Sequence, residues 1–362
     1  MPFVPGFLPS LNAPLFPNGP WPAGTDIWID ISGLGPVWIN GTGLGLCGGM
    51  SFLTRDIFEA GTPQLQSPDS TLLPVPLVKH IQSRLIDSFK PLPLIPATWL
   101  ELDQYNFDGT FARSVAEAPG IMADIDAARL CPIGVMLVSG TSAPWDVFSN
   151  HVELVWGYER NSGTGVLKLH VYDCNAPGRD DMTISLDISG KGGTKMISTT
   201  GTSSGSAPGT IQGFFRLQYQ PADPSPAYVD DAVVLISEPP PSYMAPGDKA
   251  SVVIQALNVG STNWTATDQY KLGSQSPLDN TTWGLNRNKL PTPVVVSQSI
   301  ATFTFGISAP RTPGDFDFQW GMVREMVHWF GAPSPVSRVH VSAKPPAPPP
   351  DPRPPPPGGD RQ

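Results

Sequence analysis

Apolar residues recur at helical spacing in three segments of the first part of the chain, residues 47–60, 76–89 and 113–130. In the first segment, apolar side chains three or four positions apart share one face, and Gly61 follows where the pattern ends. The third segment contains Pro119 followed by a glycine, a pair that interrupts helices. The pattern therefore predicts two helices and a third that is interrupted at Pro119.

Beyond these segments the pattern changes to short β-rich runs bounded by turn residues. The runs in the first half are Ile133–Ser139, His151–Glu159, Val166–Asp173, Met182–Ile188 and Phe214–Tyr219. A loop rich in Gly, Ser and Thr is expected over residues 189–210. Helices followed by a sheet predict an α+β domain, which we place at residues 30–220, after an extended lead-in over residues 1–29.

The second half of the chain carries strand signals alone, over residues 228–342. Short strands at this spacing predict an all-β, Ig-like sandwich, and the preceding proline-containing segment Pro221–Ala227 marks the boundary. Prolines dominate residues 343–362, so a disordered, polyproline-type tail is expected there.

The charge balance argues against several classes of partner. Charged residues make up only 15% of the chain, the formal net charge is −9, and no basic run occurs, so we expect no nucleic-acid binding. No stretch approaches the ~20 apolar residues that a membrane span needs. No Lys or Arg precedes Arg55, so no classical signal peptide is expected, which leaves the localisation open between the cytoplasm and export by a non-classical route. We expect no cofactor and no metal, because no phosphate-binding glycine loop and no histidine pair at metal-ligand spacing occurs.

The string GLCGGM places Cys47 at the start of the first predicted helix. A helix N-terminus favours the reactive thiolate because unpaired N–H groups surround it. Gly48 and Gly49 are expected to let a substrate backbone approach. The N–H of Cys47 and the side-chain amide of Asn40 are expected to hold an oxyanion. The alternative is a tight turn before a helix, with a small core cysteine.

His151 opens one predicted strand, and Asp173 ends the next one. Two antiparallel strands joined by a turn place the start of the first beside the end of the second, so these side chains should be neighbours. Together with Cys47 they predict a thiol nucleophile, a general base and an orienting acid. Asn175 is the fallback for the orienting role. The alternative is a structural histidine and a simple turn in the string DCNAPG.

The chain has three cysteines, an odd number that permits one reactive thiol beside a disulfide. The predicted strand directions place Cys131 and Cys174 at opposite ends of the sheet, too far apart for a disulfide. We therefore expect three free thiols, which fits a reducing compartment.

The strings GLCGGM, NHVELVWGYE and LHVYDCNAPG resemble papain-like cysteine peptidases, most closely the bacterial proteins with a GLCGGM nucleophile turn. The resemblance covers roughly residues 30–220 and implies a papain-like fold and a peptide or protein substrate. It also implies that Cys47 is the nucleophile, His151 the general base and Asp173 the orienting residue. An acid in third place resembles the bacteriocin-processing peptidases.

Four of the ten tryptophans lie in the second half of the chain, Trp264, Trp283, Trp320 and Trp329. The strings LGSQSP, NTTWGLNR and TPGDFDFQW around them resemble the Ig-like four-tryptophan domain of selective-autophagy receptors. This resemblance implies that the domain recognises a protein or a glycan ligand through these residues. The alternative is that the tryptophans fill the core of a small sandwich.

Three interpretations of the function remain open from the sequence. The first is a thiol hydrolase, a peptidase or amidase with an Ig-like module that recognises a target. The second is a non-catalytic binding protein on a papain-like shell. The third is a transglutaminase-like acyltransferase, which would use the same triad and differ only in its product.

Overall fold

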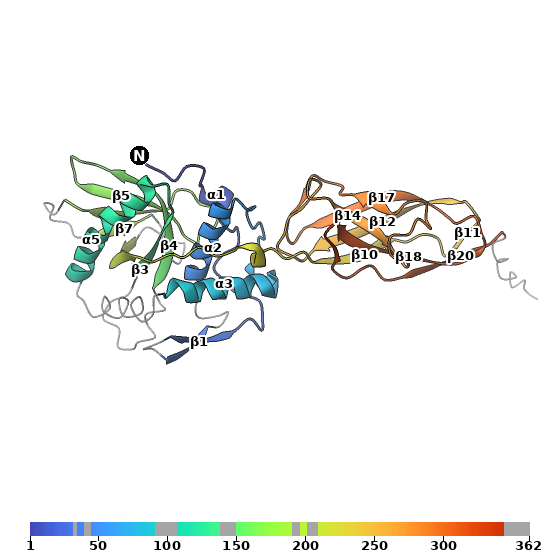
Figure 1. Cartoon of the computed structure of the whole chain (residues 1–362), viewed down its shortest axis with the longest axis horizontal. Coiled ribbons are helices and arrows are strands. Elements are labelled where there is room, and N and C mark those ends of the chain that lie inside the picture. Colours follow the sequence, from blue (N-terminus) through green and yellow to red (C-terminus); the bar gives the residue numbers. More distant parts are fainter. Residues whose placement is uncertain are drawn as a thin grey trace, which may run out of the picture. The chain divides into compact units, whose positions relative to one another are not determined.

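The computed structural model describes residues 1–31, 35–39, 45–90, 107–137, 150–189, 196–200 and 209–343. Contacts between residues divide the chain into two compact units. Unit 1 consists of Met1–Ala232, Leu257–Thr265 and Val294–Ile300, and unit 2 of Val233–Ala256, Ala266–Pro293 and the chain from Ala301 on. The described helices all belong to unit 1 (Figure 1). The predicted proline-rich tail lies, from residue 344 on, outside the described residues.

The described helices of unit 1 are α1 (Pro9–Asn12), α2 (Cys47–Ala60), α3 (Val75–Ser88) and α5 (Phe107–Asp126), with short 3-10 turns at Ser70–Leu72 and Ser225–Ala227. The helix predicted over residues 47–60 is confirmed as α2. It ends where Gly61 takes a left-handed backbone with φ of 63°, a conformation that glycine adopts at little cost, and bonds its N–H to the carbonyl of Phe58.

The predicted interruption at Pro119 is wrong, because α5 runs through it without a break. A proline inside a helix costs about 3 kcal/mol. The neighbouring side chains of Ala118 and Ile121 are fully buried in the core, and burying a side chain such as isoleucine contributes about 1.5–3 kcal/mol. The side chain of Arg216 packs closely against Gly120, where a Cβ would lie 2.7 Å from Nη1 of Arg216. Tertiary packing therefore holds the helix together.

Seven described strands of unit 1 form one sheet in the order β8-β7-β6-β5-β4-β3-β9, and every pairing in it is antiparallel. They are β3 (Cys131–Met136), β4 (His151–Arg160), β5 (Val166–Tyr172), β6 (Thr183–Asp187), β7 (Ile197–Thr199), β8 (Gly209–Ile211) and β9 (Gly213–Arg216). The prediction that an antiparallel sheet follows the helices of this half is thus confirmed, since β3 to β9 all come after α5. The loop expected over residues 189–210 contains β7, because the buried Ile197 pairs with Ile211 of β8.

The first 29 residues, expected to be an extended lead-in, join the core of unit 1. Val4 is buried, and its N–H donates to the carbonyl of Trp156 at 2.8 Å. Phe3 bridges to Gly157, where a Cβ would lie 2.1 Å from the phenyl ring. The missing side chain of Gly157 therefore lets the N-terminal segment lie against β4. Next along the chain, β1 (Ile27–Ile31) and β2 (Gly35–Ile39) form an antiparallel hairpin.

The second half of the chain contains two larger sheets, in the orders β10-β12-β17 and β11-β20-β18-β14-β15, with β19 on β18. Their strands are β10 (Ala232–Glu238), β11 (Tyr243–Met244), β12 (Lys249–Asn258), β14 (Tyr270–Gln275), β15 (Arg287–Lys289), β17 (Ile300–Ser308), β18 (Gly314–Arg324), β19 (His328–Phe330) and β20 (Ser337–Val341). A further pair is β13 (Trp264–Thr265) with β16 (Val294–Val295).

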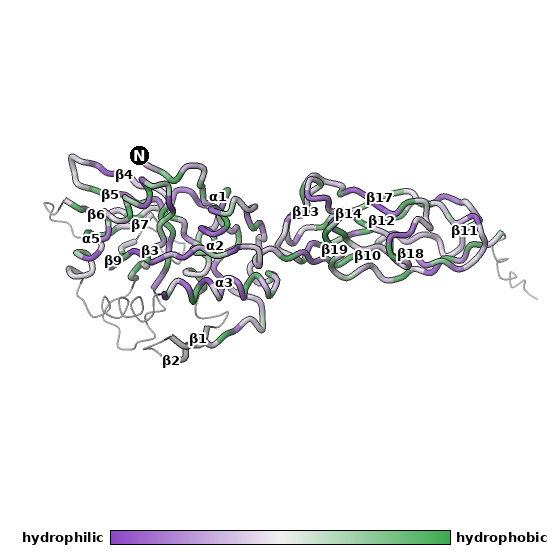
Figure 2. Tube along the Cα trace, viewed as in Figure 1, coloured by the Kyte–Doolittle hydropathy of each residue, from purple (hydrophilic) through white to green (hydrophobic). Residues whose placement is uncertain are grey.

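The two larger sheets share apolar contacts. Every second residue of β12 from Val252 to Ala256 is buried, as expected for strands with one face on a core. Phe305 of β17 packs edge-on against Trp320 of β18, with ring centres 4.9 Å apart. Both units carry hydrophobic stretches among hydrophilic ones (Figure 2). No helix in the described part of the chain is both long enough and apolar enough to cross a membrane.

Candidate active site

Cys47 is the first residue of α2, and its side chain is half-buried. Leu46, just before it, donates its N–H to Oδ1 of Asn18 at 2.6 Å. Asn18 donates its own N–H to the carbonyl of Cys174 at 3.1 Å. Asn18 therefore ties the start of α2 to the chain just after β5. Sequence reasoning missed Asn18, because an asparagine in a proline-rich segment is indistinguishable from an ordinary turn residue.

The two glycines after Cys47 are buried and face α3. A Cβ on Gly48 would lie 2.4 Å from Oγ of Ser88, and one on Gly49 would lie 2.0 Å from the carbonyl oxygen of Ile81. No side chain fits at such distances. The expectation that these glycines admit a substrate backbone is therefore replaced by a packing role, because they let α3 approach the first turn of α2.

His151 and Asp173 are neighbours, as the strand pattern predicted. Leu154 of β4 pairs with Tyr172 of β5, and this register brings the start of β4 beside the end of β5. Nε2 of His151 lies 2.8 Å from Oδ1 of Asp173, and both side chains are buried. The same Oδ1 accepts the backbone N–H of Asn175 at 2.8 Å. Asn175, the fallback residue, thus contributes to the site by holding the carboxylate of Asp173.

The electrostatic surroundings of His151 favour its protonated form. Burial alone would lower the pKa of His151, but the charges of Asp173 and Cys47 and hydrogen bonds to both side chains outweigh burial and hold this pKa well above its usual value. Because Nε2 is bonded to Asp173, Nδ1 is the ring nitrogen left for Cys47.

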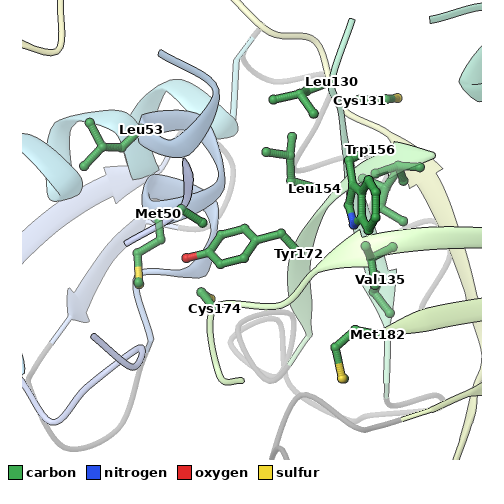
Figure 3. Packing of buried hydrophobic residues seen from close by; sticks show 14 of the residues in the cluster. Met50, Leu53, Leu130, Cys131, Val135, Leu154, Trp156, Tyr172, Cys174 and Met182 are labelled. Carbon is green, nitrogen blue, oxygen red and sulfur yellow. The ribbon is translucent and has the colours of Figure 1, made fainter. Parts of the chain in front are cut away.

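Cys174 is a buried thiol beside this pair, and Figure 3 shows it near Met50 of α2, toward which Tyr172 extends. One side-chain atom from each of His151, Asp173 and Cys174 lies within 4.8 Å of the others. Atoms this close together could hold a metal ion, and two of the three residues, His151 and Asp173, are already joined by a hydrogen bond. The expected lack of a metal or cofactor stays a prediction.

The three cysteines are free. Cys131 of β3 lies opposite Val155 of β4, and Val155 lies opposite Val171 of β5. Val171 precedes Cys174 by only three residues, so Cys131 and Cys174 lie toward the same end of the sheet. The expected placement of these two cysteines at opposite ends of the sheet is wrong, because the short β3 begins opposite the middle of the longer β4. Burial raises the pKa of the Cys131 thiol to about 12, and burial with nearby charges raises that of Cys174 well above its usual value.

A buried acid that sequence reasoning missed lies close to His151 and Asp173. Glu153 follows His151 by two positions on β4, so the two side chains point to the same face of the strand. The alternation of HVELV is the only sequence signal that places Glu153 on the same face as His151. It was missed because a glutamate in a strand normally faces solvent. Asn40, the predicted oxyanion donor, lies outside the described residues.

Three of the four tryptophans proposed for binding are buried, namely Trp264, Trp283 and Trp320. Their burial favours the alternative that they fill the core. Trp329 of β19 is partly exposed, and the guanidinium of Arg287 lies 4.8 Å from its ring centre. A ligand-binding role stays a prediction, and of the four rings the one at Trp329 is the most accessible to a ligand.

We expect Trp283→Ala to lower the free energy of unfolding by about 3–5 kcal/mol, because it empties a large buried volume. Trp329→Ala, the matched control, loses a contact with Arg287 worth about 0.5–1 kcal/mol. Urea denaturation followed by circular dichroism measures both. Equal losses in the two variants would contradict the core role of Trp283.

Comparisons with known proteins identify no family. No family model and no curated protein matches the chain. Among solved structures, the CARDB domain of a Pyrococcus furiosus protein is 14% identical, with a TM-score of 0.23, covering 32% of this chain and 96% of that domain. The complex of Dpr2 Ig1-Ig2 with DIP-Theta Ig1-Ig3 contains a match at 10% identity and a TM-score of 0.16, covering 59% of this chain and 83% of that one. At these TM-scores neither likeness bears on the function.

Proposed function

We propose that unit 1 is a papain-like thiol hydrolase, a peptidase or amidase, in which Cys47 is the nucleophile. The observation that carries the proposal is the 2.8 Å hydrogen bond between His151 and Asp173, on an imidazole whose pKa is also raised by Cys47. A thiol, a base and an acid in this series are the elements of nucleophilic catalysis. His151 acts as general base, and Asp173 fixes the orientation of its ring.

In the proposed reaction, Nδ1 of His151 takes the proton of Cys47, and Sγ attacks the carbonyl carbon of a peptide or protein substrate. The N–H of Cys47 and a side-chain amide hold the oxyanion. Asn40 is the candidate from the sequence, and Asn18 is a described amide beside the same helix start. The imidazolium then protonates the leaving amine, and water activated by His151 hydrolyses the thioester.

The second half of the chain is proposed to be an Ig-like sandwich that recognises a protein or glycan ligand. Its strand-only composition and the partial exposure of Trp329 support this role.

An amine in place of water as the acyl acceptor would make unit 1 a transglutaminase-like acyltransferase. Mass analysis of the products with and without an added amine separates this reaction from hydrolysis.

Iodoacetamide at pH 6 should alkylate Cys47 in the folded protein at least tenfold faster than in the urea-unfolded chain. The reason is that the folded protein holds the imidazole of His151 as a base for Sγ, whereas the unfolded chain has no base fixed beside it. Cys131 and Cys174 should react slowly in the folded protein, because both are buried with raised pKa values. Mass spectrometry of the labelled peptides gives the three rates.

The Cys47→Ala variant provides the background rate for this experiment. Slow and equal labelling of the three thiols in the folded protein would contradict the proposed hydrolase and favour the non-catalytic binding protein.

A further inference from the structure

Two buried carboxyl oxygens beside the triad have no hydrogen-bond partner among the described residues, Oε2 of Glu153 and Oδ2 of Asp173. The side chains are also well enclosed, since Glu153 is 6% exposed and Asp173 is 1% exposed. Oδ1 of Asp173 is already used by His151 and by the backbone of Asn175. An unpaired buried carboxylate oxygen is costly, so a donor for Oδ2 is expected.

The groups around Glu153 favour its neutral form. Burial raises the pKa of Glu153 to about 8, the charge of Asp173 adds to this effect, and His151 opposes it. The thiol of Cys174 is a further neighbour, and its own pKa is raised by burial first and then by the charges around it, including those of Cys47 and Glu153. From β3, the apolar Ile133 pairs with Glu153, so this strand brings no charge to it at that position.

We propose that Glu153 keeps its proton at neutral pH and donates its O–H to Oδ2 of Asp173. Glu153 is thereby a positioning residue, which holds the carboxylate of Asp173 in place while that carboxylate orients His151. The positioning role rests on the proposed function. The proton shared between Glu153 and Asp173 is independent of that function. Oδ1 of Asp173 is already engaged by His151 and by the N–H of Asn175, so Oδ2 is the oxygen left to accept from Glu153.

Ionisation of Glu153 should remove the hydrogen bond to Asp173 and with it the fixed orientation of His151. Without its proton, Glu153 has no O–H to donate, and two carboxylates then share one buried site and repel each other. His151 loses its fixed orientation as Asp173 moves. Glu153→Gln is the matched variant, because its amide is neutral at every pH and can still donate to Oδ2. Glu153→Leu has a similar size and cannot donate.

Infrared difference spectra between pH 6 and pH 10 test the shared proton directly, without any substrate. We expect the intact protein to show the carbonyl stretch of one protonated carboxylic acid, which disappears with a midpoint near pH 8. The Glu153→Gln variant should lack this band. A spectrum without the band at pH 6, or a band that persists in Glu153→Gln, would overturn the inference.

The pH dependence of turnover tests the positioning role. A group with a pKa of about 8 is about nine-tenths ionised at pH 9, so turnover in the intact protein should fall about tenfold from pH 7 to pH 9. The ratio of turnover at pH 9 to that at pH 7 should be about tenfold higher in Glu153→Gln, and Glu153→Leu should be impaired at both values. Equal ratios in the intact protein and in Glu153→Gln would show that Glu153 only fills space. If the infrared band behaves as expected but Cys47 labels slowly, the hydrolase proposal fails and the shared proton stands.

Discussion

Replacing His151 with alanine should lower kcat/KM for a susceptible amide by about 10²–10⁴-fold, the range contributed by a general base. The imidazole is hydrogen-bonded to Asp173, and Cys47 contributes to its raised pKa, so it is the base on which the proposed reaction depends. Turnover of a fluorogenic peptide-amide library measures the loss. Iodoacetamide labelling of Cys47 at pH 6 should slow in parallel, because Sγ loses the base that would take its proton.

His170 provides a matched control for this substitution. Its Nε2 lies 2.9 Å from Oε1 of Glu159, so it too is a histidine on a strand of the same sheet with a carboxylate partner. Its ring packs against Phe3 and Trp156. His170→Ala should therefore cost some stability and leave turnover unchanged. Similar losses of turnover in both variants would point to general destabilisation instead of the loss of a base.

The second large effect should come from Asp56→Ala, which we expect to lower the free energy of unfolding by about 3–5 kcal/mol. Asp56 of α2 and Arg84 of α3 form a buried ion pair with two contacts, at 2.7 and 3.1 Å. Asp56 also accepts hydrogen bonds from Tyr219 and from the N–H of Ala222. Its removal leaves the guanidinium of Arg84 buried without its main counter-charge. Thermal and urea denaturation measure the loss.

Glu59→Ala is the control on the same helix. Glu59 pairs with Arg55 at 2.6 Å, four residues apart at the surface, and such pairs contribute about 0.3–0.5 kcal/mol. The double variant Asp56→Leu with Arg84→Leu should be more stable than Asp56→Ala, because no unpaired charge remains. A loss after Asp56→Ala as small as that after Glu59→Ala would contradict the role of the buried pair.

Local signals in the sequence were enough to locate the helix that begins at Cys47 and the strand that begins at His151. Helix spacing and an end at Gly61 are properties of neighbouring residues, so α2 was predicted with its observed bounds. The proximity of His151 and Asp173 was also predictable, because two antiparallel strands joined by a turn leave few alternatives for their ends.

Interactions between distant segments decided the features that the sequence could not predict. Nothing near Pro119 shows that α5 passes through it, because the burial that stabilises the helix comes from the sheet. From the sequence, Gly48 and Gly49 were expected to let a substrate backbone approach Cys47. Only the packing of α3 shows why side chains are excluded at these two positions.

By itself, the sequence of this protein determined that Cys47 begins a helix and that His151 and Asp173 lie side by side, because local periodicity and turn placement set the ends of their elements. Only the tertiary structure decided what surrounds them. It placed Asn18 beside the start of α2, and it buried Glu153 close enough to Asp173 for the charge of Asp173 to raise its pKa. The electrostatic environment of His151 is a sum over these neighbours, which no local pattern encodes.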